Sequence, residues 1–197
     1  MRRTLYRFLA VPVVAAGVLA GVAVAAPSAF ASTDTGGTVT VTVPLSYLKQ
    51  LASAGVVAFP VPLSEASVDK TNQTATVTFT VTGGNGDVRT FFGSVDLSGQ
   101  LEIADANGQD VTFGNLVLNL RSGDIEGTPT GSTTPVSLLK LAGNVTFTPG
   151  ATSQSINATE LTVESAGASY LDSALGTSAF TAGQNVGSMA ATWDFSV

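Results

Sequence analysis

Apolar and polar residues alternate along much of the chain, which is the pattern of half-buried β-strands. Residues 38–43 read Thr-Val-Thr-Val-Thr-Val, and residues 74–82 place Val77, Phe79 and Val81 on one face with threonines on the other. An Asn-Gly pair at 107–108 predicts a hairpin turn. The pattern predicts short strands at 38–43, 56–63, 74–82, 91–97, 100–104, 111–113, 116–121, 125–127, 136–141, 144–148, 160–165 and 189–195.

Two short segments have helical spacing instead. Residues 45–54 place three leucines in one stripe and stop before Gly55, and residues 169–176 form a second short amphipathic stretch. Residues 32–37 are interpreted as a mobile start, and the Thr/Pro/Gly-rich residues 128–135 as a loop.

Many short strands separated by turn residues indicate an all-β fold. We therefore expect an antiparallel β-sandwich, or a barrel-like sandwich, with one or two short helices. No internal repeat or linker divides residues 32–197, which are interpreted as a single domain.

The first 31 residues have the organisation of a secretory signal peptide. Arg2, Arg3 and Arg7 precede an uncharged stretch over 8–26, and Ala29-Phe-Ala31 provides small residues at the expected cleavage site. A retained N-terminal anchor is the alternative, because a stretch of this length is close to what a bilayer requires. The leader predicts a secreted protein, extracellular or associated with the cell surface.

The net charge and the missing residue types exclude several classes of partner and of active site. Without the leader, five Lys and Arg residues face fourteen Asp and Glu residues, a net charge of −9. Such an acidic chain disfavours nucleic acid and anionic membranes as partners, because both require a basic surface. The chain has no cysteine and no histidine. This excludes Ser-His and Cys-His nucleophilic sites and the usual zinc sites.

Two Ser-x-x-Lys pairs, Ser46/Lys49 and Ser137/Lys140, have the spacing found in serine β-lactamases and penicillin-binding proteins. The Ser-Asp-Asn and Lys-Thr-Gly elements that accompany it there are absent. Ser137 also falls in a predicted strand, where residues three apart face opposite sides. We therefore predict no catalytic residues and a protein that is not an enzyme.

Two further motifs involve polar turns. Asp105, Asn107 and Asp110 supply oxygens at a spacing that partly resembles a calcium loop, but the full EF-hand pattern is missing, so a hairpin turn is the preferred interpretation and no metal site is predicted. The N-glycosylation pattern occurs three times, at Asn72, Asn144 and Asn157.

Among the aromatic residues, Phe79, Phe113 and Phe147 lie in strand patterns and are expected in the core. Tyr47 and Tyr170 lie on the predicted helices, each next to the end of a strand. Either tyrosine packs its ring and leaves its hydroxyl in water, or it contacts a ligand. Tyr47 and Tyr170 are the candidate ligand-binding residues.

The order of elements resembles the Htaa-type domain of secreted haem-acquisition proteins of Gram-positive actinobacteria. The similar stretches are Leu45-Ser-Tyr-Leu, Phe79-Thr-Val-Thr-Gly-Gly, Gly93-Ser-Val-Asp-Leu-Ser-Gly-Gln-Leu-Glu-Ile and Phe180-Thr-Ala-Gly. The resemblance implies Tyr47 as a ligand of haem iron, a role that tyrosinate can perform. The family's Gly-His segment stands here as Gly99-Gln100.

We expect a secreted, non-enzymatic interaction module that binds an extracellular protein or a component of the cell envelope and has no cofactor. The alternative is an Htaa-like haem-binding protein that uses Tyr47. An extracellular hydrolase is the least favoured function, because no acid–base pair is recognisable.

Overall fold

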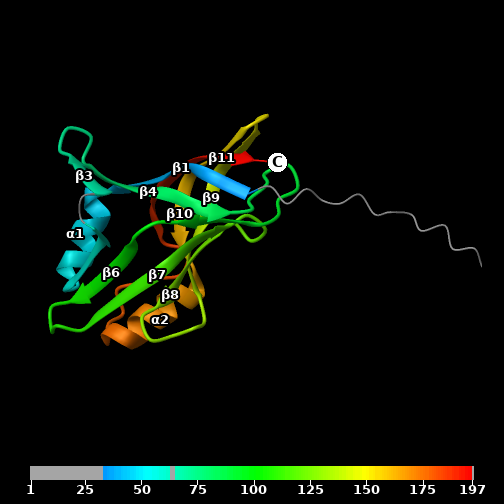
Figure 1. The fold of residues 1–197 in the computed structure, drawn as a ribbon. Coiled ribbons are helices and arrows are strands. Elements are labelled where there is room, and N and C mark those ends of the chain that lie inside the picture. Colours follow the sequence, from blue (N-terminus) through cyan, green and yellow to red (C-terminus); the bar gives the residue numbers. More distant parts are fainter. Residues whose placement is uncertain (1–32, 63–64, 197) are drawn as a thin grey trace, which may run out of the picture.

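The computed structural model describes residues 33–62 and 65–196, and the predicted signal peptide lies outside them. Two helices, α1 (Leu45–Ser53) and α2 (Ser165–Leu175), accompany an antiparallel sheet (Figure 1). The strands are β1 (Thr33–Pro44), β2 (Val56–Val61), β3 (Ala66–Asp69), β4 (Thr74–Gly84), β5 (Ser94–Leu97), β6 (Gln100–Asp105), β7 (Asp110–Asn119), β8 (Asp124–Pro129), β9 (Val136–Pro149), β10 (Ser153–Val163) and β11 (Asn185–Ser196).

Eight of these strands close into a barrel. Their order is β7-β5-β4-β1-β11-β10-β9-β8, and the pairing of β8 with β7 closes the circle. Strands β6 and β2 continue the sheet outward from β7, and β3 pairs with β4. The prediction of an all-β antiparallel fold, a sandwich or barrel-like sandwich with one or two short helices, is confirmed, and the structure has the barrel-like form with two helices.

The alternation of apolar and polar residues along the strands gives the barrel a mostly apolar interior. Inward positions on neighbouring strands carry apolar residues, and Trp193, Phe113, Leu118, Ile156 and Leu161 are fully buried there. Threonines occupy many outward positions of β1 and β4, which suits the pleated, solvated face of a sheet.

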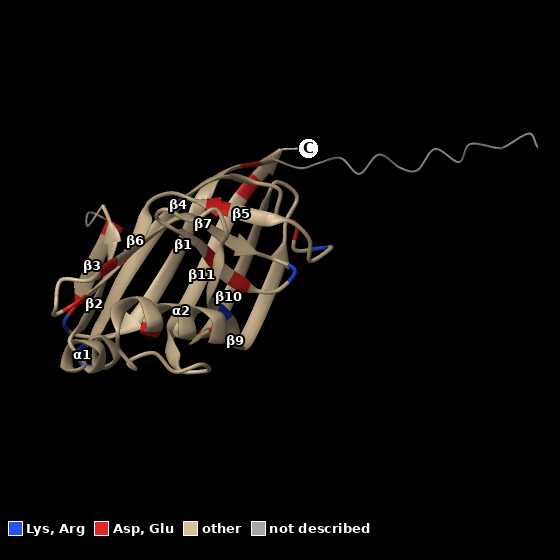
Figure 2. Cartoon of the chain, turned by 90° about the horizontal axis from the view of Figure 1, so that it is seen from below, with Lys and Arg blue, Asp and Glu red and all other residues tan. Residues whose placement is uncertain are grey.

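Both helices lie towards the end of the barrel away from the C-terminus (Figure 2), where α1 contacts β1 and β2, and α2 contacts β7 and β9. Helix α1 follows directly after Pro44, whose backbone is extended. Gly176, in the left-handed conformation that glycine adopts without strain, ends α2. No helix in the described part of the chain combines the length and the apolar character that a membrane crossing requires.

The predicted mobile start at 32–37 is wrong for residues 33–37. Strand β1 begins at Thr33, which pairs with Ser196 of β11, and the side chain of Asp34 is buried. A polar, glycine-containing stretch is thus held in the sheet by its partner strand.

Several predicted strand boundaries are also wrong. Strand β7 is continuous through Asn115, where the register shifts, and β9 runs from Val136 to Pro149 as one strand. Strand β3 and the first half of β10 had no predicted counterpart. Phe91 has a φ of 52° and lies in a loop, so β5 begins only at Ser94.

Two smaller corrections concern α2 and the aromatic core. Helix α2 begins at Ser165, four residues before its predicted start, because the preceding strand ends at Val163. Phe79 and Phe113 are buried as expected, whereas Phe147 is 36% exposed.

Candidate functional site

The barrel wall opens at the end that carries α1. Strand β5 has four residues, and it bridges β4 and β7 only near Gly84 and Asn119. Beyond β5, towards α1, β4 pairs with β3 and β7 pairs with β6. Among the described strands, β3 pairs only with β4 and β2 only with β6. Beyond β5, the sheet therefore continues as two regions with no described strand pairing between them, β1-β4-β3 and β7-β6-β2.

The first of these regions presents apolar rows to the interior. Directly paired residues share a face of a sheet. Val43, Ala75 and Val68 are aligned across β1, β4 and β3. The adjacent row has the same character, with Val41 and Val77 followed by Ala66.

The second region presents matching rows. Ala58, Ile103 and Val111 are aligned across β2, β6 and β7, and Pro60 and Leu101 begin the neighbouring row. The polar residues of these strands, such as Glu102, alternate onto the other face. Two apolar surfaces thus face the same interior.

Between these surfaces lies a cavity of about 310 Å³. This volume falls at the lower end of the range of small-molecule sites, about 300–1,000 Å³. Of the described residues that line it, all but Ser67 and Tyr47 have apolar side chains. The lining residues are Val39, Val41, Val43, Tyr47, Leu48, Leu51, Ala58, Phe59, Pro60, Ala66, Ser67, Val68, Ala75, Val77, Phe79, Leu97, Leu101, Ile103, Leu116, Ile125, Leu138, Leu139, Val163, Leu171, Phe180 and Val186.

The apolar cavity reaches the surface at β3. Val68 lines it and is nevertheless 59% exposed, and the adjacent Ala66 and Ser67 are exposed as well. Val57 of β2 is similarly exposed, at 50%, but does not line the cavity. The cavity wall is therefore exposed to solvent at β3.

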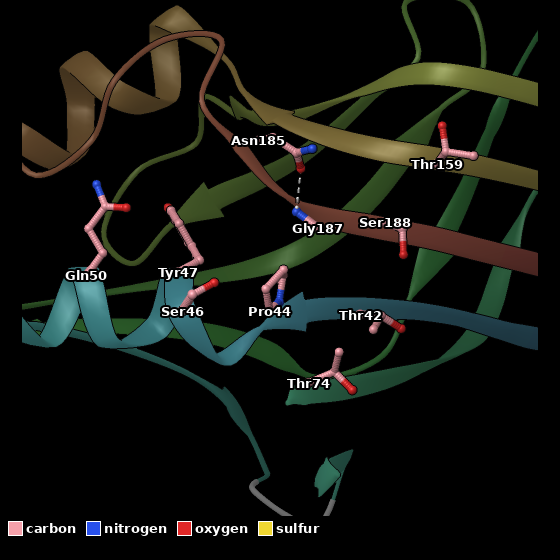
Figure 3. A pocket seen from close by; sticks show the side chains of 10 residues that line it. All are labelled: Thr42, Pro44, Ser46, Tyr47, Gln50, Thr74, Thr159, Asn185, Gly187 and Ser188. Atoms are coloured by element: carbon pink, nitrogen blue, oxygen red, sulfur yellow. Dashed lines mark hydrogen bonds between the residues drawn. The ribbon is translucent and has the colours of Figure 1, made fainter. Parts of the chain in front are cut away.

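A second hollow, which we call the polar groove, lies on the other side of β1 (Figure 3). It is open and has a volume of about 480 Å³. None of its described lining residues carries a charge, and most carry hydroxyl or amide groups. They are Thr42, Pro44, Ser46, Tyr47, Gln50, Thr74, Thr159, Asn185, Gly187 and Ser188.

Among the described residues, Tyr47 alone lines both hollows. Its side chain projects from α1 (Figure 3), and its ring packs against the core. Burial raises the pKa of its hydroxyl to about 12. The phenol is therefore neutral at physiological pH, and its O–H donates no hydrogen bond to any described residue.

The other candidate tyrosine lies elsewhere. Tyr170, on α2, stacks edge-to-face on Phe113 with ring centroids 5.7 Å apart. It lines neither the cavity nor the polar groove. The structure thus places Tyr47, but not Tyr170, at a hollow.

Neither Ser-x-x-Lys pair has the arrangement of a nucleophile and its base. The Lys140 ammonium lies 3.4 Å from both Asp124 and Glu164, and Asp124 in particular raises its pKa. A lysine held protonated in this way is a poor proton acceptor. Ser46 and Lys49 are exposed side chains on α1.

The turn at 105–110 uses its carboxylate internally. Asp105 Oδ1 accepts hydrogen bonds from the backbone N–H groups of Gln109 and Asn107, and the Gln109 bond in particular lowers the pKa of this carboxyl. No group of three or more Asp, Glu, His or Cys side chains suited to a metal ion occurs within 33–62 and 65–196. The three asparagines of the N-glycosylation pattern, Asn72, Asn144 and Asn157, are exposed.

The chain matches no family model, and no curated protein matches it. The site is therefore described by its own chemistry. An apolar cavity and an uncharged groove share a neutral tyrosine, and together they offer apolar and hydrogen-bonding contacts to a ligand.

Proposed function

We propose that the protein is a secreted, non-enzymatic binding module whose partner is a small apolar molecule held in the cavity. The observation that carries this proposal is the apolar lining of a cavity that opens at β3. Burial of a ligand there gains about 25 cal/mol per Å² of apolar surface removed from water. The proposed partner of the interaction module is therefore a small molecule rather than a macromolecule.

Haem binding through Tyr47 is the weaker alternative. A tyrosinate ligand requires loss of the phenol proton, and burial opposes this by raising the pKa of Tyr47 to about 12. The described linings of the cavity and the groove contain no Lys or Arg that would pair with haem propionates. A neutral apolar ligand requires neither feature.

A neutral fluorescent probe, N-phenyl-1-naphthylamine, tests the proposal. We expect saturable fluorescence enhancement with the natural protein. Ala58→Phe places a ring inside the cavity and should reduce binding at least about tenfold. Val57→Phe is the matched control, because the neighbouring side chain on β2 lies outside the cavity.

Absence of saturable binding by the natural protein would contradict the proposal, as would equal effects of the two variants. Titration with haemin separates the alternative. A tight complex with a shifted Soret band, lost in Tyr47→Phe, would establish haem binding through Tyr47 instead.

A further inference from the structure

The apolar cavity and the polar groove lie on opposite sides of one strand. Along β1, Val41 and Val43 face the cavity, whereas Thr42 and Pro44 line the groove. This follows from the alternation of side chains in a strand. The body of the sheet thus separates two chemically different hollows.

Helix α1 brings the two hollows together where β1 ends. Leu48 and Leu51 line the cavity, and Ser46 and Gln50 line the groove. With about 3.6 residues per turn, Tyr47 projects between these two faces of the helix. It therefore stands at the boundary, with its ring against apolar residues and its hydroxyl available to a polar group.

The groove favours a particular kind of polar group. Hydroxyl and amide side chains both donate and accept hydrogen bonds, whereas a charged head would find no described counter-ion in the lining. Placing an ion among neutral groups with partial loss of water is unfavourable. An uncharged group that carries several hydroxyls fits this chemistry.

We propose that the ligand is an amphiphile whose hydrocarbon part occupies the apolar cavity and whose uncharged, hydroxyl-rich head occupies the polar groove. A glycolipid has this chemistry. The inference rests on the proposed function, because it assigns the tail to the same cavity. It adds a second site and a reason for the position of Tyr47.

Displacement of bound N-phenyl-1-naphthylamine by decyl glucoside, decan-1-ol and decanoate tests this, with decyl glucoside and decanoate below their micellar concentrations and decan-1-ol below its solubility limit. The three share a tail and differ in the head. Decyl glucoside should displace the probe at a concentration about tenfold lower than decan-1-ol, which corresponds to one or two net hydrogen bonds. Decanoate should show no such gain.

Variants on α1 test whether the advantage of decyl glucoside over decan-1-ol comes from the polar groove. In the double variant Ser46→Ala/Gln50→Ala, the advantage of decyl glucoside over decan-1-ol should disappear, while displacement by decan-1-ol stays unchanged. Lys49→Ala is the matched control, because Lys49 is exposed on the same helix and lines neither hollow. It should retain the full advantage.

The possible failures are distinguishable. If the probe does not bind the natural protein, the proposed function itself is wrong. If the probe binds but decyl glucoside is no better than decan-1-ol, or its advantage survives the double variant, only the amphiphile proposal is overturned. If decanoate displaced the probe at a lower concentration than decan-1-ol, the proposal of an uncharged head would also be overturned.

Discussion

The two ends of the barrel differ in how they are closed. At the end where β1 begins, the loop over residues 85–93 crosses the barrel, and hydrogen bonds with buried side chains of the barrel hold it in place. Trp193 Nε1 donates to the Gly86 carbonyl over 3.3 Å, and Gln154 Oε1 accepts from Val88 N–H over 2.6 Å. At the α1 end the wall divides and an apolar cavity remains.

The closed end tolerates buried polar groups because they satisfy the backbone of the crossing loop. Gly86 N–H donates to Asp34 Oδ2 over 3.0 Å, and a side chain at Gly86 would meet Val95 and Leu120 at 3.1 Å or less. The open end has apolar surface without such crosslinks. The comparison shows that closure of the barrel depends on a loop fixed to buried side chains, whereas the proposed ligand binding depends on the absence of such a loop at the α1 end.

Removal of the central side chain of the closed end should have the largest effect. Trp193 is fully buried. Trp193→Ala should lower the free energy of unfolding by about 3–5 kcal/mol, because it leaves a cavity and removes a donor to the crossing loop. Urea denaturation measures this loss. A cost below about 1 kcal/mol would show that the loop closes the barrel without it.

The stability of the closed end should depend on pH through the buried carboxyl group of Asp34. Burial raises its pKa from 3.8 to about 6, and Asp96 adds to this, although the Gly86 hydrogen bond opposes it. The folded state therefore binds the proton more tightly than the unfolded state. This group stabilises the fold at low pH, and its contribution falls as pH rises from about 4 to about 6.

The difference between the natural chain and Asp34→Asn isolates this contribution. Asparagine retains an oxygen acceptor for Gly86 N–H and does not ionise. Relative to the natural chain, the variant should gain up to about 3 kcal/mol of stability between pH 4 and pH 7. A difference that does not change with pH would show that Asp34 keeps its ordinary pKa in the folded protein.

One substitution made at both ends compares their packing directly. Val95 is fully buried near the crossing loop, whereas Val77 is half-buried and lines the cavity. Val95→Ala should cost about 2 kcal/mol and Val77→Ala about half of that, because Val77 already borders unfilled space. Equal costs in urea denaturation would indicate that the open end is packed as tightly as the closed end.

Local pattern predicted much of this fold. The valines of 38–43 and the apolar residues of 74–82 face inward as their alternation required. The helix over 45–54 is confirmed to within one residue, and Tyr47 lies at a hollow. These features depend on residues that are neighbours in sequence.

Features that depend on pairing could not be predicted from the pattern. The shortness of β5, the division of the wall and the position of β3 arise from which strands meet. Asp34 is buried because β1 extends to meet β11, although its flanking residues are polar. Val68 is the clearest example, because the four-residue stretch Ala-Ser-Val-Asp is too short for its pattern to distinguish a strand from a turn.

The smallest expected effect concerns the entrance to the cavity. Val68 and Val57 are both exposed valines on β-strands, but only Val68 lines the cavity. Lysine at either position keeps its ammonium in water, so each substitution should change the free energy of unfolding by no more than about 0.5 kcal/mol. Val68→Lys should nevertheless slow the association of N-phenyl-1-naphthylamine severalfold, because its stem and hydration shell occupy the entrance, whereas Val57→Lys should leave the rate unchanged. Stopped-flow fluorescence measures both rates. Equal rates in the two variants would mean that ligands enter the barrel somewhere other than at β3.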